Sequence, residues 1–215
     1  MQIFNENEIK FKIPSTLLIS GPSSSGKTTF LLKLIEESKY LFNPNPSNIF
    51  YAYGQYHKDV TYLQRKGVRV FAGVPDETLV DSLPPYTILI FDDLMINMPE
   101  EFLSSLFTRK SHHQKLACIF LTQNLFDKKL KVARNNSHYI VLMNSPSALL
   151  SIRNLGSQLF PKNLSYFLDA YKKACQKRFG YLLIDLSPYS DQSLRLRTNI
   201  FKDDEKIIFL PNSRS

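Results

Sequence analysis

The chain has 215 residues, 43% of them hydrophobic, and a formal net charge of +8. This length and hydrophobic content suit one folded domain and exclude a disordered polymer, while the basic charge favours polyanions such as nucleic acid as partners. No run approaches the roughly 18 to 20 apolar residues of a membrane span, and residues 1–14 lack the basic start and apolar run of a secretory signal, so we expect an intracellular protein that is not secreted.

The first half of the chain predicts strands that alternate with helices. A short apolar run at 16–20 predicts a buried strand that ends in a glycine-containing loop. Apolar residues at helical spacing predict a helix over 27–39, and the Asn-Pro-Asn-Pro run at 43–46 prevents its continuation. The next predicted elements are a strand at 48–53, a helix at 58–65 and a strand at 68–71.

The second half continues the same alternation. Continuous apolar runs predict buried strands at 87–91, 116–122 and 138–143. Helical patterns fall at 99–107, 147–155 and 164–174, and the segments 181–185 and 207–210 are late strands or an edge hairpin. This order predicts an α/β fold with a mostly parallel sheet and helices on both faces. One domain over 1–215 is the simplest partition, with a core at about 14–145 and a C-terminal extension at about 146–215.

The loop from Gly21 to Thr28 fits the phosphate-binding pattern G-x-x-x-x-G-K-[ST], and it lies between a predicted strand and a predicted helix. The two glycines let the backbone N–H groups turn toward phosphate oxygens, and the helix N-terminus adds partial positive charge. Lys27 is predicted to reach the β- and γ-phosphates, and the Thr28 hydroxyl to coordinate Mg²⁺. The predicted nucleotide-binding residues are Gly21, Pro22, Ser23, Ser24, Ser25, Gly26, Lys27, Thr28 and Thr29. The motif predicts a P-loop NTPase.

Polar residues follow two later predicted strands. Asp92 stands at a strand tip, where a P-loop enzyme needs a carboxylate to hold Mg²⁺ directly or through water. Asp93 is the predicted base that orients and deprotonates the attacking water. At the end of the 116–122 strand, Gln123 is the first choice for a γ-phosphate sensor and Asn124 the second. Lys27, Asp93 and Gln123 therefore predict hydrolysis by water.

Other charged residues have less definite roles. Arginine stabilises transition-state charge in many such enzymes, often from a neighbouring subunit, and the best candidate is Arg134; the others are Arg109, Arg153 and Arg178. His112 and His113 have no acidic or cysteine partner at ligand spacing, so we expect them to shape the loop before the 116–122 strand or to touch phosphate rather than to bind zinc. Basic residues are denser at 128–134, 172–178 and 195–197, which we expect to be exposed.

Several segments together resemble the FtsK–HerA superfamily of pumping ATPases. More closely, they are similar to the genome-packaging ATPases of poxvirus-type large DNA viruses, adintoviruses and Polinton/Maverick elements. The matching segments span most of residues 15–201, and they are Tyr51–Gly54, Ile90–Met95, Leu106–His113, Leu121–Phe126, Asn136–Val141 and Arg195–Phe201. The chain departs from the family pattern at Lys131, where an arginine is expected, and at 145–148, which contains no arginine.

The resemblance implies a RecA-like core in which the glutamine-tipped strand lies between the P-loop strand and the Asp92 strand. It also implies ATP and Mg²⁺ as cofactors, a homo-oligomeric ring, and the threading of double-stranded DNA into a capsid, with capsid or portal components as partners. The family's roles carry over to Lys27, Thr28, Asp92, Asp93 and Gln123. The expected location is the host nucleus or a cytoplasmic viral factory, or the virion itself.

Three other classes of protein fit the P-loop. A small nucleoside or nucleotide kinase suits the length, but no arginine-rich lid follows Asp93, and such a kinase would place the P-loop and Asp92 strands side by side. A GTPase switch would read guanine through an Asn-Lys-x-Asp run, which the chain lacks. A scaffold that only binds nucleotide would not need the second carboxylate of Asp93.

Overall fold

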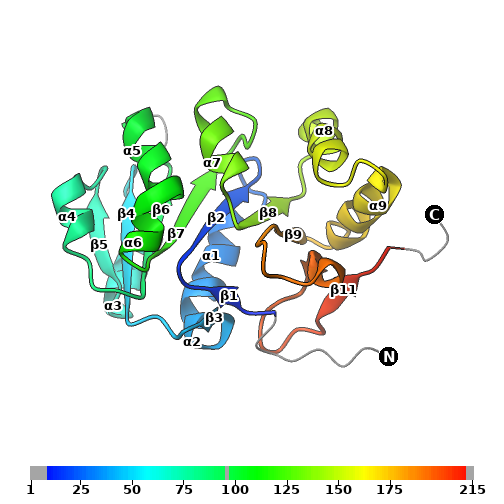
Figure 1. The fold of residues 1–215 in the computed structure, drawn as a ribbon. Helices are drawn as coiled ribbons and strands as arrows, with labels where there is room; N and C mark the ends of the chain where they lie inside the picture. Colours follow the sequence, from blue (N-terminus) through cyan, green and yellow to red (C-terminus); the bar gives the residue numbers. More distant parts are fainter. Residues whose placement is uncertain (1–8, 95–96, 212–215) are drawn as a thin grey trace.

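The computed structural model describes residues 9–94 and 97–211, so Met95 of the Ile90–Met95 motif and most of the 1–14 segment lie outside the described residues. In the described part, nine strands form one sheet in the order β11-β10-β9-β8-β2-β7-β6-β4-β5 (Figure 1). The parallel strands are β2 (Ser15–Ser20), β4 (Asn48–Tyr53), β5 (Arg69–Ala72), β6 (Thr87–Asp92), β7 (Ala117–Thr122) and β8 (Tyr139–Met143). The predicted mostly parallel sheet is therefore confirmed.

Antiparallel strands extend the sheet beyond β8. These are β9 (Tyr181–Asp185), β10 (Leu196–Thr198) and β11 (Ile207–Phe209). The two late strands expected from the sequence do form, but they are not a hairpin with each other, because β10 lies between them. The short β1 (Phe11–Lys12) and β3 (Phe42–Asn43) pair in a separate small sheet. The division of the chain into one domain stays a prediction, although β9 to β11 continue the same sheet as the P-loop strand.

Helices cover both faces of the sheet, as the alternation predicts (Figure 1). One face carries α1 (Lys27–Glu36), α2 (Ser38–Leu41) and α3 (Lys58–Arg65). The other carries α4 (Glu77–Asp81), α5 (Glu100–Ser105), α7 (Lys131–Asn135), α8 (Leu149–Leu159) and α9 (Leu164–Ala174). Within the described ranges, every helix is too short or too polar to cross a membrane.

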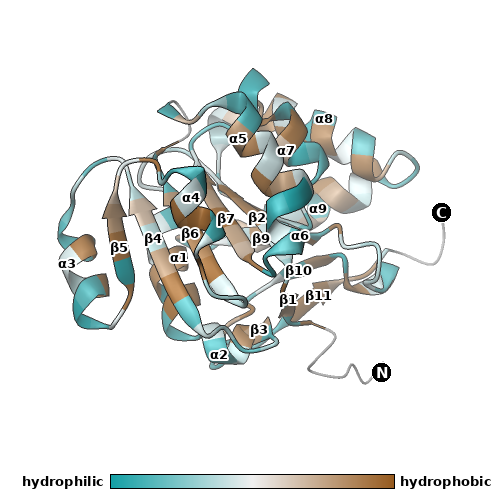
Figure 2. Ribbon diagram, turned by 60° about the vertical axis from the view of Figure 1, so that its left-hand side comes forward, coloured by the Kyte–Doolittle hydropathy of each residue, from teal (hydrophilic) through white to brown (hydrophobic). Residues whose placement is uncertain are grey.

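The core forms on both faces because side chains alternate along each strand. In β2, Leu17 and Ile19 pack against Leu34 of α1, whereas Leu18 faces the opposite cluster with Phe102 of α5. Hydrophobic residues accordingly concentrate along the central strands (Figure 2). Both cysteines, Cys118 and Cys175, are buried and free.

The helix expected at 99–107 continues further than predicted. After α5, a π-helical turn at Leu106–Lys110 leads into α6 (Ser111–His113). Buried Leu106 and Phe107 prolong the apolar side of α5, which keeps the segment on the sheet. The loop expected around His112 and His113 is therefore helix.

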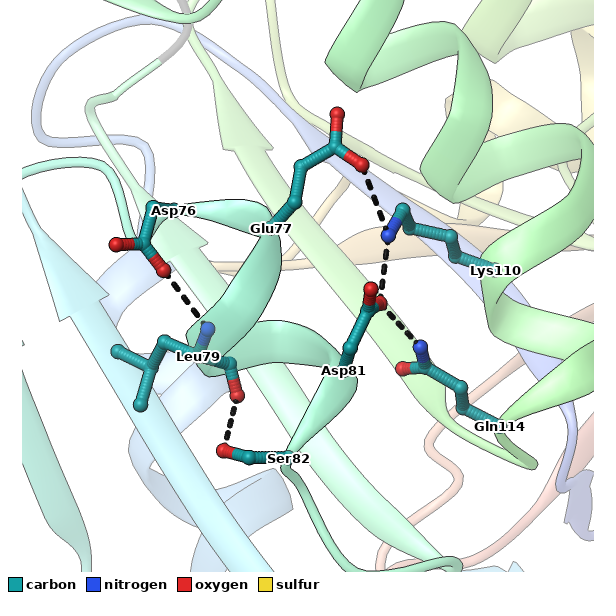
Figure 3. A network of polar contacts seen from close by, with 7 residues as sticks. All are labelled: Asp76, Glu77, Leu79, Asp81, Ser82, Lys110 and Gln114. Atoms are coloured by element: carbon teal, nitrogen blue, oxygen red, sulfur yellow. Dashed lines mark hydrogen bonds and ion pairs between the residues drawn. The ribbon is translucent and has the colours of Figure 1, made fainter.

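Lys110 fixes α4 to this helical segment (Figure 3). Its Nζ forms ion pairs with Glu77 at 3.0 Å and with Asp81 at 2.5 Å. Gln114 also donates to Asp81, and Asp76 caps α4 by accepting from the N–H of Leu79. The Lys110 of the Leu106–His113 motif thus has a structural role in this fold.

The basic group at 195–197 differs from the expected exposed patch. Only 2% of Arg197 is exposed, because β10 directs its side chain into the interior. Its Nη2 donates to Oδ2 of Asp185 at 2.8 Å. Arg197 is a buried partner of β9 and cannot contact an external polyanion.

Candidate nucleotide site

The P-loop connects β2 to α1 and has the conformation that its glycines permit. Gly26 has a φ of +103°, a region that side-chain-bearing residues rarely adopt. A Cβ on Gly21 would lie 2.5 Å from Cβ of Met143, at the end of β8. Buried Phe30, Leu31 and Leu34 hold α1 on the sheet, so its N-terminus and the loop form a fixed unit. This arrangement matches an anion site at a helix N-terminus.

Lys27 lies inside the curl of this loop. Its Nζ donates to the carbonyl oxygens of Gly21 at 2.6 Å and Pro22 at 2.9 Å. Burial lowers the pKa of Lys27, and the nearby carboxylates of Asp92 and Asp93 oppose that shift. The P-loop cation therefore lies close enough to interact with both the predicted metal ligand Asp92 and the predicted base Asp93.

The strand order brings the predicted site residues together. Strand β7 pairs with β2 on one side and with β6 on the other. Because parallel strands end at the same edge, Gln123 after β7 lies between the P-loop and Asp92. One cleft is lined by all of these, by the loop that follows β4 and by the start of α3; its walls are Ser23, Ser24, Lys27, Thr28, Gln55, Tyr56, His57, Lys58, Asp59, Asp92, Asp93, Leu121, Thr122 and Gln123.

Asp92 is held by side chains that sequence reasoning missed. The Tyr51 hydroxyl donates to Oδ2 of Asp92 at 2.5 Å, and Nε2 of His57 lies 3.1 Å from the same hydroxyl. His57 Nδ1 is 3.4 Å from Asp59. Burial raises the pKa of Asp92, and the Tyr51 hydrogen bond partly offsets this by favouring the carboxylate. The only sequence signal was Tyr51 within the Tyr51–Gly54 segment, and its spacing from Asp92 gave no sign of contact.

Asp93 and Gln123 both present exposed side chains at the cleft. Asp93 has a φ of +55°, which turns the chain sharply after β6. A Cβ on Gly54 would lie 2.5 Å from the Asp93 carbonyl oxygen, so glycine permits this close approach of β4. Oδ1 of Asn124 accepts from the N–H of Phe126 and shapes its own loop, which favours Gln123 over Asn124 as the residue that faces a ligand.

The candidate arginines lie in different places. Nη1 of Arg134 donates to the Leu125 carbonyl at 2.9 Å, and its guanidinium lies over the ring of Phe126. Arg134 therefore clamps the loop that follows Gln123 and does not line the cleft of its own chain. Arg178 instead lines a second cleft, on the other side of the P-loop.

The two adjacent histidines are remote from this edge of the sheet. The His112 ring is tilted against the His138 ring, with ring centroids 5.3 Å apart, close to the start of β7 and β8. Neither His112 nor His113 lines the two clefts beside the P-loop. Among residues 9–94 and 97–211, no group of three or more His, Cys, Asp or Glu could hold a metal ion.

The residues present nevertheless fit Mg²⁺ bound together with a nucleotide. The Thr28 hydroxyl and the Asp92 carboxylate line one cleft, and both are oxygen donors of the kind that Mg²⁺ prefers. Mg²⁺ is commonly held by one or two protein oxygens plus substrate phosphates. Thr28 and Asp92 would hold the ion, and a nucleotide bound to the P-loop would supply the phosphate oxygens.

This fold is that of the P-loop NTPases, with a phosphate loop between β2 and α1 and an acidic strand tip across β7. The chain is similar to the genome packaging NTPase B204 from Sulfolobus turreted icosahedral virus 2. Its sulfate complex has a TM-score of 0.53 at 13% identity, covering 92% of this chain and 97% of that one. Its AMPPCP complex has a TM-score of 0.52 at 14% identity, covering 92% and 98%. At these identities the likeness shows a shared fold. No protein-family model and no curated protein matches the chain.

Proposed function

We propose that the chain is an ATP-hydrolysing motor that packages viral or viral-like double-stranded DNA into a capsid. The observation that carries this proposal is the common cleft, in which Lys27, Asp93 and Gln123 meet at the ends of adjacent strands. The fold shared with a viral genome packaging NTPase supports it, as does the resemblance of the sequence to FtsK–HerA packaging ATPases of the poxvirus, adintovirus and Polinton type.

The proposed reaction is attack of water on the γ-phosphate. Lys27 would transfer its hydrogen bonds from the loop carbonyls to phosphate oxygens, and Mg²⁺ held by Thr28 and Asp92 would supply charge neutralisation. Asp93 would orient the water and accept its proton while the oxygen bonds to γ-phosphorus and the bond to the β-phosphate oxygen breaks. Gln123 would detect the departure of the phosphate.

The kinase alternative is less well supported. A kinase of that class would place β2 directly beside β6, whereas β7 separates them. The glutamine at the tip of this inserted strand stands where it can position water. Water is therefore the acceptor that we propose.

DNA contact is proposed for the segment that follows Gln123. Lys128 and Lys131 are exposed, and the loop between them and Gln123 is fastened by Arg134. A movement of Gln123 would thus displace these lysines, because the short loop that joins them is held by Arg134. Contacts of this kind bind the DNA backbone without reading sequence, so affinity should fall as salt rises.

The assembly is also a proposal. We infer a homo-oligomeric ring with ATP at subunit boundaries, where Arg134 of a neighbouring subunit, once it exchanges the Leu125 carbonyl for phosphate, acts as the arginine finger. Capsid or portal components would be the partners, and the host nucleus, a viral factory or the virion the location. Mass measurement with ATP tests the ring, since a strict monomer under all conditions would contradict it.

The deciding experiment measures ATP turnover with and without double-stranded DNA. We expect DNA to stimulate the native chain, and both Lys27→Ala and Asp93→Asn to abolish turnover. Asp203→Asn, an exposed aspartate outside the P-loop clefts, is the matched control and should behave as the native chain does. Turnover that ignores DNA would contradict the motor, and turnover that survives both site variants would contradict the assigned site.

A further inference from the structure

The turn between α9 and β9 packs directly against the P-loop. Ring and Cβ atoms of Phe179 lie 2.7 to 2.9 Å from the position that a Cβ on Gly26 would occupy. This contact joins the phosphate loop to a segment more than 150 residues later in the sequence. The function proposed above gives this contact no role.

The turn itself has a tightly determined backbone. The N–H of Gly180 donates to the Lys177 carbonyl at 2.9 Å, and a Cβ on Gly180 would lie 2.4 Å from the carbonyl oxygen of Ala174. Phe179 has a φ of +60°, a conformation that non-glycine residues seldom adopt. The fold therefore holds Phe179 against the loop, although 40% of this large apolar residue stays exposed.

Arg178 adds a second flat group to this surface. Its guanidinium carbon lies 4.8 Å from the centre of the Phe179 ring. Both residues line a cleft whose other walls are Lys177, Asn144 and the P-loop residues Pro22 to Thr29. This cleft shares four P-loop residues with the one that contains Asp92 and Gln123, so the P-loop lies between the two.

The position of the cleft suggests which part of a nucleotide it would meet. The γ-phosphate must lie toward Asp92, Asp93 and Gln123 if water is to attack it there. A nucleotide laid along the loop then extends its sugar and base in the other direction, past Thr29 toward Asn144 and Arg178. A base there would meet flat aromatic and guanidinium surfaces, on which nucleobases stack.

We propose that the Arg178–Phe179 pair is the base-stacking platform of the nucleotide site. This inference rests on the proposed nucleotide chemistry, and it assigns the base to residues outside the P-loop motif. Stacking accepts any π-face, so the platform would add affinity without strong discrimination between bases.

The test compares ATP with inorganic tripolyphosphate, which has the phosphate chain but no base, by calorimetry in the presence of Mg²⁺. We expect Arg178→Ala and Phe179→Leu to weaken ATP binding about tenfold and to leave tripolyphosphate binding unchanged. Phe179→Leu keeps an apolar contact for Gly26, and Phe179→Tyr should retain ATP affinity because it keeps the ring. Lys162→Ala, which removes an exposed charge outside both clefts, controls for the loss of net charge.

A second readout uses the absence of tryptophan from the sequence. Phe179→Trp supplies the sole tryptophan of the chain, whose emission should change with ATP and not with tripolyphosphate. If Arg178→Ala weakens both ligands equally, the arginine binds phosphate and the stacking proposal is wrong. If ATP binds the native chain tightly but none of the variants alters its affinity, the platform is wrong while nucleotide binding stands. If the native chain binds neither ligand, both proposals fail.

Discussion

The hydroxyl of Tyr51 in β4 lies 2.5 Å from Oδ2 of Asp92 at the tip of β6. The two strands are paired, with Tyr51 opposite Ile90 and Tyr53 opposite Asp92. The hydrogen bond therefore holds the carboxylate diagonally across the ladder.

Replacing this tyrosine tests its positioning role. Tyr51→Phe should raise the Mg²⁺ concentration needed for half-maximal ATP turnover by roughly tenfold, because a hydrogen bond to a charged group is lost. Turnover at saturating Mg²⁺ should recover in large part. Tyr53→Phe is the matched control, since Tyr53 stacks on Tyr51 with ring centroids 6.2 Å apart but is not the residue that donates to Asp92. Equal Mg²⁺ dependence in the two variants would contradict the role.

Gly26 should tolerate no side chain. Gly26→Ala combines the strain of a positive φ, about 1–3 kcal/mol, with a clash against Phe179. Gly67→Ala is the control, because Gly67 also has a positive φ, of +84°, and an alanine there would be strained in the same way. An added Cβ at Gly67 would clash with nothing, since no atom lies within 4 Å of its position. Urea unfolding should show a larger loss of unfolding free energy for Gly26→Ala, together with weaker nucleotide binding. Similar losses at the two sites would show that the Phe179 contact is unimportant.

His138 should make the protein less stable in mild acid. Its Nδ1 accepts from the N–H of Thr16 at 3.2 Å, which requires the neutral ring. Burial first, and then the nearby His112, lower the pKa of His138 below its ordinary value. The unfolded chain therefore binds more protons between that lowered pKa and about 6.5, so unfolding free energy falls as the pH falls through this window.

The measurement is urea unfolding at about pH 7.5 and about pH 5.5. His138→Gln keeps an acceptor for Thr16 but does not titrate, so its stability should change less between the two conditions. His113→Gln, an exposed neighbour on α6, should retain the native pH dependence. If the stability of His138→Gln changes with pH as much as that of the native chain, the pH dependence comes from other groups.

The Lys110 network should contribute little stability and should respond to salt. Lys110 is mostly covered, but the side chains of Glu77 and Asp81 are 64% and 50% exposed. Solvent screening limits such pairs, so Lys110→Met should cost about 1 kcal/mol or less. The difference in unfolding free energy between Lys110→Met and the native chain should shrink in high salt, whereas the difference for Lys162→Met should not depend on salt. A loss that is insensitive to salt would indicate packing rather than charge.

Much of the local structure follows from the sequence itself. Unbroken apolar runs give β6 and β7 because strands buried on both faces need them, and the glycine spacing of the P-loop determines a backbone that can surround phosphate. The same apolar runs show where each strand ends, and they therefore place Asp92, Asp93 and Gln123 at strand ends. The helix after Pro99 was predicted too short. The π-helical turn at Leu106–Lys110 extends the apolar face of α5, and only the tertiary structure shows that this face packs on the sheet.

The sequence alone thus determined the P-loop and the residue types at the strand tips, since both depend on neighbours along the chain. The insertion of β7 between β2 and β6 came from family resemblance rather than from spacing, and the tertiary structure confirms it. Only that structure decided that Tyr51 holds Asp92, that Arg197 is buried against Asp185, and that Phe179 rests on Gly26. These contacts join residues between 12 and more than 150 positions apart, and strand order and register, not local pattern, bring them together.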